Sequence, residues 1–145
     1  MTESLFEETR LLFHALKQWV ESLHGGREIT VPMRAVLELL LRAGPRTVPE
    51  MARARGVSRQ HIQQQVDELL GRGLAERRDN PAHRRSVRIA LTDEGRALIQ
   101  DMRAHELDRL SRLQAGVSDH AVREATQVLG AWRSALQEDL QRRSG

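Results

Sequence analysis

Several side chains that can form specific hydrogen bonds lie close together in the segment after Val57. They are Ser58, Arg59, Gln60, His61, Gln63 and Gln64, followed after a short gap by Arg84 and Arg85. A glutamine amide can pair with adenine through two hydrogen bonds, and an arginine guanidinium can pair with guanine in the same way. Arginine also binds the phosphates of the DNA backbone. These residue types therefore predict contacts to duplex DNA, without defining a base sequence.

The segment 59–72 is predicted to form the helix that positions most of these side chains. Its apolar residues recur at about 100° per residue and therefore share one helical face. They are Ile62, Val66, Leu69 and Leu70. Gln60 and Gln64 project from the opposite side, and the acidic Asp67 and Glu68 come near the C-terminal end. A helix that enters the major groove by its N-terminal half needs this layout, because its carboxylates then stay away from phosphates.

A shorter helix is predicted to precede this one and to meet it in a tight corner. Thr47 and Glu50 form a capping box at its start, and Pro49 is tolerated in the first turn. Gly56 supplies the left-handed residue that ends it, and Ser58 caps the next helix. A corner of this kind between two short helices predicts a helix-turn-helix.

Two short strands joined by a basic loop are predicted next. Leu74 starts the first strand, and the segment 86–91 alternates between apolar and polar residues. The residues expected on its buried face are Val87, Ile89 and Leu91. The loop 79–85 ends in the arginine pair, which can lie along a DNA backbone or place a guanidinium in a narrow minor groove. The order of corner, helix and hairpin predicts a winged helix-turn-helix.

Longer amphipathic helices are predicted around this unit. They cover about 5–23, 31–43 and 93–114, and a last helix follows the capping residue Ser118. His105 and Glu106 interrupt the apolar stripe of the third. The stripe of the last helix is wide and consists of Val122, Ala125, Val128, Leu129, Trp132, Ala135, Leu136 and Leu140. Together with the aromatic first helix, this stripe provides more apolar side chains than one small core needs. The excess predicts a homodimer interface.

The expected fold is mainly α with a small β-hairpin wing: a winged helix-turn-helix flanked by N- and C-terminal dimerisation helices. Residues 30–95 would form the DNA-binding region, and residues 1–29 and 96–145 the helical dimerisation region. The charge distribution agrees with this division. The segment from Arg53 to Arg88 holds nine arginines and four acidic residues, a net charge of +5, in a chain of net charge +3. A basic segment in an otherwise slightly acidic chain predicts a polyanionic partner.

The sequence disfavours several other classes. The absence of cysteine excludes disulfides, thiolate zinc sites and thiol redox sensing. The chain lacks a G-x-S-x-G motif, a phosphate loop, a dinucleotide fingerprint and an H-E-x-x-H pair, so we expect no enzyme, no cofactor and no metal site. No apolar run approaches the roughly 20 residues of a membrane span, and the acidic N-terminus does not resemble a secretory signal. We therefore expect a cytoplasmic protein without membrane contact. A winged helix used only for protein–protein contact is the alternative.

The chain resembles the MarR family of multiple-antibiotic-resistance-type regulators over almost its whole length. The resemblance is strongest from Val57-Ser58 to Leu91-Thr92-x-x-Gly95, and it includes an Arg-Gly-Leu strand entry and a basic wing with an aspartate. It implies a dimer that binds a pseudo-palindromic operator, usually as a repressor. It also implies DNA contacts from Ser58, Arg59, Gln60, His61, Gln63, Gln64, Arg84 and Arg85.

The resemblance further implies that Asp79 braces an arginine of the wing. Many relatives carry a second acid before the arginine pair, where this chain has His83, so the brace is expected to be weaker. We expect His83 to contact phosphate or solvent, and a brace that titrates with pH is the alternative. Relatives commonly bind small aromatic compounds between the dimer helices and the winged helix. The residues of this chain near that junction are His14, Trp19, His24 and Met33, which are also suited to core packing.

Overall fold

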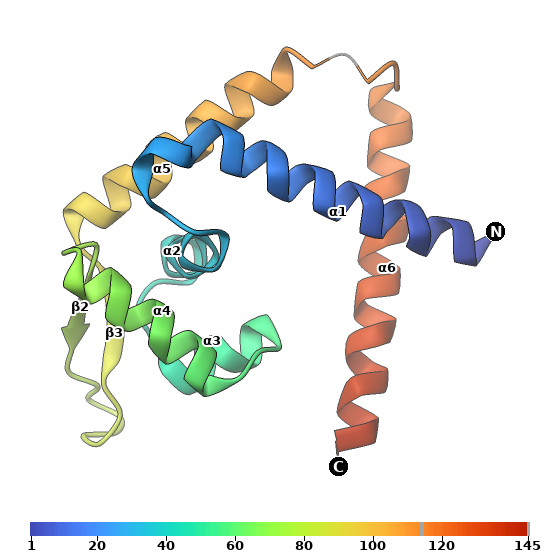
Figure 1. Ribbon diagram of the computed structural model, residues 1–145. Coiled ribbons are helices and arrows are strands. Elements are labelled where there is room, and N and C mark those ends of the chain that lie inside the picture. Colours follow the sequence, from blue (N-terminus) through green and yellow to red (C-terminus); the bar gives the residue numbers. More distant parts are fainter. Residues whose placement is uncertain (114, 145) are drawn as a thin grey trace. The chain divides into compact units, whose positions relative to one another are not determined.

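The computed structural model describes residues 1–113 and 115–144 and is mainly helical (Figure 1). Its elements, in chain order, are α1 (Thr2–His24), the short 3-10 helix η1 (Gly25–Arg27), α2 (Val31–Ala43), β1 (Arg46–Thr47), α3 (Val48–Arg55), α4 (Arg59–Gly71), β2 (Ala75–Arg78), β3 (Arg88–Leu91), α5 (Asp93–Ser111) and α6 (Asp119–Ser144). The predicted order of helices and wing is confirmed. For the predicted helix 93–114, the structure ends α5 at Ser111, and the predicted end at Gln114 lies outside the described residues.

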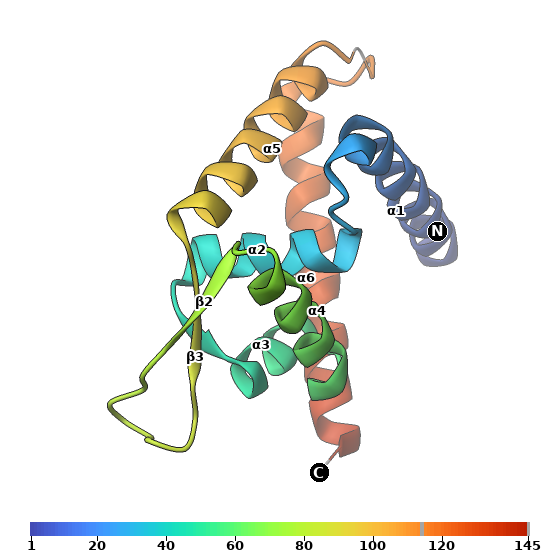
Figure 2. The same cartoon turned by 60° about the vertical axis from the view of Figure 1, so that its left-hand side comes forward.

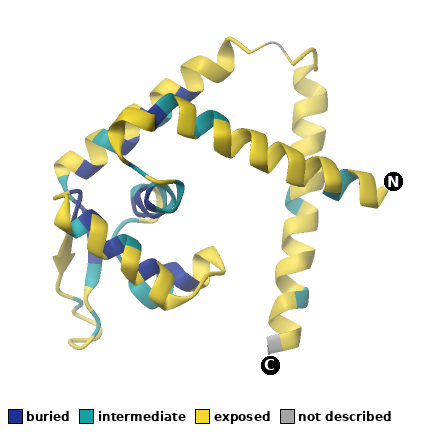
Figure 3. Ribbon diagram, in the orientation of Figure 1, coloured by how far each residue is buried: buried dark blue, intermediate teal, exposed yellow. Residues whose placement is uncertain are grey.

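The chain divides into two compact units, one from Met1 to Asp108 and one from Arg109 onward. The first unit contains the apolar core, which gathers side chains from α2, α3, α4 and the strands, with Ile99 of α5. Leu37, Met51 and Leu69 are fully buried there. Figure 3 shows that the buried residues concentrate in this part of the chain, whereas α6 in the second unit is exposed along most of its length.

The helices of the first unit begin at the capping residues that the sequence predicts. The side chains of Thr30 and Ser58 accept hydrogen bonds from the backbone N–H groups of Met33 and His61, over 3.3 and 3.1 Å. At α3 the box is reciprocal: Thr47 Oγ1 accepts from Glu50 N, and Glu50 Oε2 accepts from Thr47 N over 2.7 Å. Each cap satisfies a backbone donor that has no partner inside its helix.

The sheet has three antiparallel strands in the order β1-β3-β2. Strands β2 and β3 form the wing, which extends from the helices in Figure 2. Strand β1 was not predicted, because two residues are too short to show an alternating pattern, and Arg46 pairs with Ile89 across a long stretch of sequence.

The expected burial of Val87 is wrong. Its side chain is 44% exposed, because β3 begins only at Arg88 and no neighbouring strand pairs with the chain before that point. Ala90 is buried together with Ile89 and Leu91, so both faces of β3 are covered and the strict alternation does not hold.

The start of α5 lies directly against the start of the wing. Thr92 N donates to the carbonyl oxygen of Leu74 over 3.2 Å, and Thr92 Oγ1 donates to that of Gly73 over 2.7 Å. One turn further, a Cβ on Gly95 would lie 1.9 Å from the Leu74 carbonyl oxygen. Only glycine permits this approach of the two backbones.

Large apolar side chains remain exposed on helices of both units. On α1 they include Leu12 and Phe13, which are 61% and 60% exposed, and on α6 they include Leu136 and Leu140. Leu136 and Leu140 belong to the apolar stripe of the last helix that was identified in the sequence. Within residues 1–113 and 115–144, no helix combines the length and the apolar character that crossing a bilayer requires.

The close approach at Gly95 predicts a large effect of a single methyl group. Gly95→Ala should lower the free energy of unfolding by about 3 kcal/mol, because backbone atoms of Leu74 must move to admit it. Gly71→Ala is the matched control, since a Cβ there meets no atom within 4 Å and the residue is helical. The control should be neutral or slightly stabilising. Urea unfolding followed by circular dichroism measures both, and equal midpoints for the two variants would contradict the prediction.

The capping box of α3 predicts a pH-dependent contribution to stability. The hydrogen bond from the Thr47 N–H holds the pKa of the Glu50 carboxyl below its ordinary value, and the nearby Arg46 and Arg88 act in the same direction. The carboxylate therefore stabilises the folded state above the unfolded-state pKa, and this contribution is lost as the pH falls through the lowered folded-state pKa.

Glu50→Gln should accordingly reduce the free energy of unfolding at pH 7, and the difference from the wild type should shrink toward pH 3. Urea titrations at a series of pH values measure it. A difference that stays constant with pH would show that the carboxylate charge is not involved.

Candidate nucleic-acid interface

The corner between α3 and α4 is an uninterrupted exposed surface. All residues from Arg53 to His61 are exposed, and Gly56 ends α3 with a φ of +65°. Helix α4 then buries Ile62, Val66 and Leu69 against the core. Because those three residues fix the rotation of α4, its opposite face is directed to solvent.

The side chains predicted to contact bases lie on this exposed face. Arg59, Gln60, His61, Gln63 and Gln64 are all exposed. Gln63 Nε2 donates to Asp67 Oδ1 over 2.9 Å, so its amide is already oriented along the helix. In the part of the chain that the structure describes, the side chains of the other four make no hydrogen bond within the protein, so their donors and acceptors are available.

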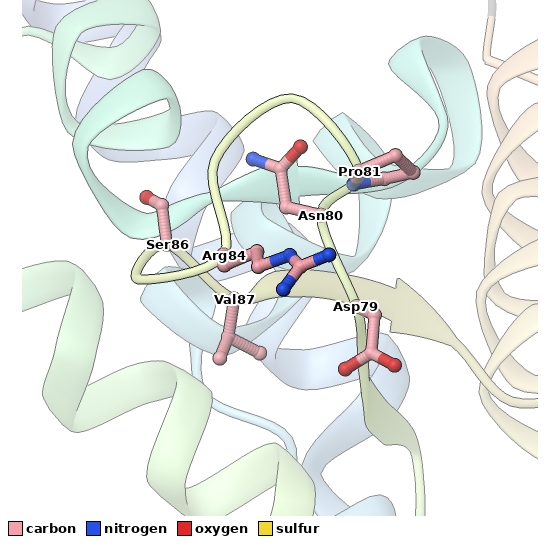
Figure 4. Close-up of a pocket in the computed structure, with 6 residues that line it drawn as sticks. All are labelled: Asp79, Asn80, Pro81, Arg84, Ser86 and Val87. Carbon is pink, nitrogen blue, oxygen red and sulfur yellow. The ribbon is translucent and has the colours of Figure 1, made fainter.

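The wing ends in a compact loop that presents the predicted arginine pair. Asn80 organises it: its carbonyl oxygen accepts from His83 N over 3.1 Å and its side-chain oxygen accepts from Ala82 N over 3.2 Å. Arg84 and Arg85 are exposed. The residues Asp79, Asn80, Pro81, Arg84, Ser86 and Val87 line a hollow inside the loop, which the Arg84 side chain enters (Figure 4).

Asp79 and Arg84 line the same hollow, but among the described residues no ion pair joins Asp79 to an arginine of the wing. The bracing role of Asp79 therefore stays a prediction. The wing arginine that does hold an acidic partner is Arg78, whose Nη2 lies 2.7 Å from Glu76 Oε1. His83 is exposed at the turn of the loop, where its imidazole is open to solvent.

The arginines of this surface differ in whether a carboxylate lies at ion-pair distance from the guanidinium. Arg72, at the C-terminal end of α4, lies within 4 Å of carboxylate oxygens of both Glu28 and Glu68. In residues 1–113 and 115–144, six arginines of the corner and the wing have no acidic side chain at ion-pair distance. They are Arg53, Arg55, Arg59, Arg77, Arg84 and Arg85. The uncompensated positive charge therefore follows the corner and the wing.

Three of those arginines, Arg53, Arg55 and Arg77, are not among the predicted contact residues. They lie in the basic segment from Arg53 to Arg88. Net charge, however, does not show which arginines pair with a carboxylate inside the protein and which do not. Their exposure and lack of acidic partners place them on the candidate interface beside the predicted residues.

The four residues predicted to bind a small ligand differ in their burial, and their role stays a prediction. His24 and Met33 are buried, His14 is exposed, and Trp19 is half-buried. Met33 belongs to the apolar core. A separate hollow between α1 and α2 is lined by Phe13, Leu16, Lys17, Val20, Val31 and Arg34, and none of the four predicted residues lines it.

A buried ionic cluster, which was not predicted, connects α1, α2 and α5. The Glu106 carboxylate accepts one hydrogen bond from Arg34 Nε over 2.9 Å and another from Arg34 Nη2. Its Oε1 also lies 2.9 Å from His24 Nε2. His24 and Glu106 are 3% and 8% exposed. The sequence signal was the interruption of an apolar helical stripe by His105 and Glu106, but the partners lie far away in the chain.

The comparisons with known proteins agree with this geometry. A model of the MarR family matches residues 29–86, which contain α2, the helix-turn-helix and most of the wing. An uncharacterised protein of Mycobacterium tuberculosis is 41% identical over 80 residues, which is 55% of this chain and 55% of that relative. The match therefore spans about half the length of the curated relative.

Solved structures extend the likeness to the whole chain. Streptococcus pneumoniae FabT, crystallised in complex with DNA, is 19% identical and matches 97% of this chain and 99% of its own with a TM-score of 0.78, which shows a shared fold. The MarR family transcription regulator SP03579 is 33% identical, covers 97% of this chain and 95% of its own, and has a TM-score of 0.81. With that identity maintained over both chains, the protein is a member of the MarR family.

Proposed function

We propose that the protein is a homodimeric, sequence-specific DNA-binding transcription regulator that represses its target and is released by a small aromatic ligand. The observation that carries the DNA-binding part is the set of uncompensated arginines and available glutamines at the α3–α4 corner and the wing. FabT, which shares this fold, was crystallised with DNA. A cytoplasmic location follows from this role.

Base recognition is assigned to the N-terminal half of α4. Placed in the major groove, this half offers the amides of Gln60 and Gln64 and the ring of His61 to base edges. Ser58 and Arg59 stand at the start of the helix, where phosphates and backbone N–H groups meet. The acidic end of α4 stays away from the DNA backbone, since Asp67 and Glu68 lie one to two turns further on.

The wing supplies contacts that do not depend on base sequence. Arg84 and Arg85 carry positive charge at the end of an exposed loop, where a guanidinium reaches phosphates or a narrow minor groove. Asp79 lies beside Arg84 in the same hollow and is suited to orient it once DNA draws the arginine outward. Phosphate contacts of this kind position the protein, and the contacts of α4 select the sequence.

Dimerisation is assigned to the terminal helices. Residues 1–29 and 96–145 carry most of the exposed large apolar side chains, whereas residues 30–95 carry the helix-turn-helix and the wing. Exposed apolar stripes of this extent mark an association surface. A two-fold dimer would read a pseudo-palindrome whose half-sites lie about 34–36 Å apart, one turn of the duplex.

Release by a ligand is assigned to the hollow between α1 and α2. Its walls are mainly apolar. Arg34 at its edge is already held by Glu38 and Glu106, so Lys17 is the cation left for the acidic group of a small aromatic molecule. His14 and Trp19 lie on the same helix α1. The chain contains no tyrosine and no cysteine, so neither a phenol hydrogen bond nor thiol oxidation takes part in sensing.

Selection of binding sites from a pool of random DNA duplexes tests the central claim. The expected result is a two-fold symmetric consensus that binds more tightly than a scrambled duplex of equal length, with affinity that falls steeply as the salt concentration rises. Absence of binding to any duplex at low salt would overturn the proposal and favour the winged helix as a protein–protein module.

Two variants distinguish base recognition by α4 from phosphate contacts by the wing, both measured on the selected duplex. Gln64→Ala should reduce the preference for the consensus over single-base variants at one position of each half-site, by about 1–3 kcal/mol. Arg85→Gln should weaken binding to consensus and scrambled duplexes alike and reduce the slope of log affinity against log salt by about 0.9 per phosphate lost.

The matched control for the arginine variant is Arg96→Gln, an exposed arginine on α5 outside the corner and the wing. It should leave both the preference and the salt slope unchanged. Fluorescence anisotropy titrations at several salt concentrations measure all three. A change of base preference in Arg85→Gln with an unchanged salt slope would contradict the assigned roles.

A further inference from the structure

Helix α1 is attached to the rest of the first unit in an unusual way. Among the described residues, no residue of α1 belongs to the apolar core cluster. Its one buried residue is His24, at its C-terminal end. The hollow described above separates part of α1 from α2. Apolar packing of the kind that holds α2, α3 and α4 together therefore does little to fix α1.

Helix α5 changes its mode of attachment along its length. Near its start, Gly95 contacts the wing entry, and Ile99 enters the apolar core. Further on, Met102 is buried, and Glu106 is the last buried residue of the helix. Beyond that point Leu107 is 62% exposed. Burial of α5 side chains on the first unit therefore ends at Glu106.

The buried end of α1 and the buried part of α5 meet in one cluster of polar side chains. Glu106 Oε1 lies 2.9 Å from His24 Nε2 and accepts from Arg34 Nε over 2.9 Å, and Glu106 Oε2 accepts from Arg34 Nη2. The remaining Arg34 nitrogen, Nη1, donates to Glu38 Oε2 over 2.8 Å, which holds the guanidinium on α2. The ring of His105 packs edge-on against that of His24, with 5.9 Å between the centroids.

The hydrogen bonds of this cluster constrain the orientation of the helices more strictly than the apolar contacts of the core do. Apolar contacts are non-directional and tolerate small rotations of one helix on another. A carboxylate that receives two parallel hydrogen bonds from one guanidinium fixes both distance and angle. Because His24 and Glu106 are buried and Arg34 is partly buried, loss of the Glu106 carboxylate leaves the guanidinium and the imidazole without their acidic partner at this point.

We propose that Glu106 is a positioning residue: through Arg34 and His24 it holds α5 and α1 in one geometry on α2 and thereby on the DNA-reading unit. The proposal rests on the proposed function for its consequence in DNA binding. Helices α1 and α5 lead to the apolar surfaces assigned to the dimer, so a loosened cluster lets the two recognition helices of a dimer vary in spacing. Binding that needs two half-sites depends on that spacing, and binding to one half-site does not.

Hydrogen exchange measured by mass spectrometry on the full chain tests the cluster without DNA. In Glu106→Gln, amides of α1 and of the second half of α5 should exchange about tenfold faster or more, while amides of α3 and α4 keep their protection. Asp101→Asn is the matched control, because it breaks the exposed pair of Asp101 with Arg27 that also joins α5 to the segment after α1. The control should leave exchange unchanged.

Three outcomes would overturn the proposal. They are equal acceleration in every element, which indicates a general loss of stability; no acceleration at all; and the same acceleration in the Asp101→Asn control. If Glu106→Gln does not fold, the double variant Arg34→Met with Glu106→Leu replaces the ion pair by apolar side chains, which buried sites generally accept. Its α1 amides should still lose protection relative to those of α4, and retained protection would overturn the proposal.

The DNA arm uses the duplex obtained by selection and a half-length duplex with one half-site. Glu106→Gln should bind the two-site duplex about tenfold or more weakly and the one-site duplex as the wild type does. Equal losses on both duplexes, or none, would overturn the positioning role. If the wild type binds neither duplex, the proposed function fails, and the exchange experiment still decides whether Glu106 holds α1 and α5.

Discussion

The organisation of the first unit depends on the burial of one face of α4. Ile62, Val66 and Leu69 are at most 2% exposed and pack among side chains of α2, α3 and the strands. That contact fixes the rotation of α4 about its own axis, and with it the direction in which every other side chain of the helix projects. A rotation of one residue, about 100°, would bury a glutamine amide without partners and expose a core side chain. The polar face is therefore a consequence of apolar packing on the other side.

The charged side chains of the first unit occur in two different environments, one exposed and one buried. At the α3–α4 corner and in the wing, arginines stand exposed without carboxylate partners, which leaves a positive potential in solvent. Around Glu106 the carboxylate is buried and is held by the Arg34 guanidinium and by His24 Nε2. Exposed charges without partners can act on other molecules, whereas the hydrogen bonds of a buried carboxylate act on the geometry of the protein itself. The same residue type, arginine, serves in both places, because its guanidinium suits both phosphate and carboxylate.

The local features of the fold could be predicted from the sequence, and the long-range ones could not. Thr30, Thr47, Ser58 and Ser118 each cap the helix that follows, because a cap depends only on residues within one turn. The face of α4 was likewise predictable from its periodicity. By contrast, β1 and the exposure of Val87 depend on where strands from distant segments stop pairing. The partners of Glu106 come from residues more than seventy positions away, a relation that no local pattern contains.

The contact between Gly95 and Leu74 also has a mechanical meaning. Because the two backbones touch without an intervening side chain, the beginning of α5 and the entry of the wing move as one body. Helix α5 has 19 residues and therefore measures about 28 Å from end to end. Between Gly95 and Glu106 the helix rises about 16 Å, so a tilt of about 5° at the wing entry displaces Glu106 by about 1.5 Å. Helix α5 thus links the base of the wing to the Glu106 cluster, so a small rotation at the wing entry and a displacement within that cluster are the same motion.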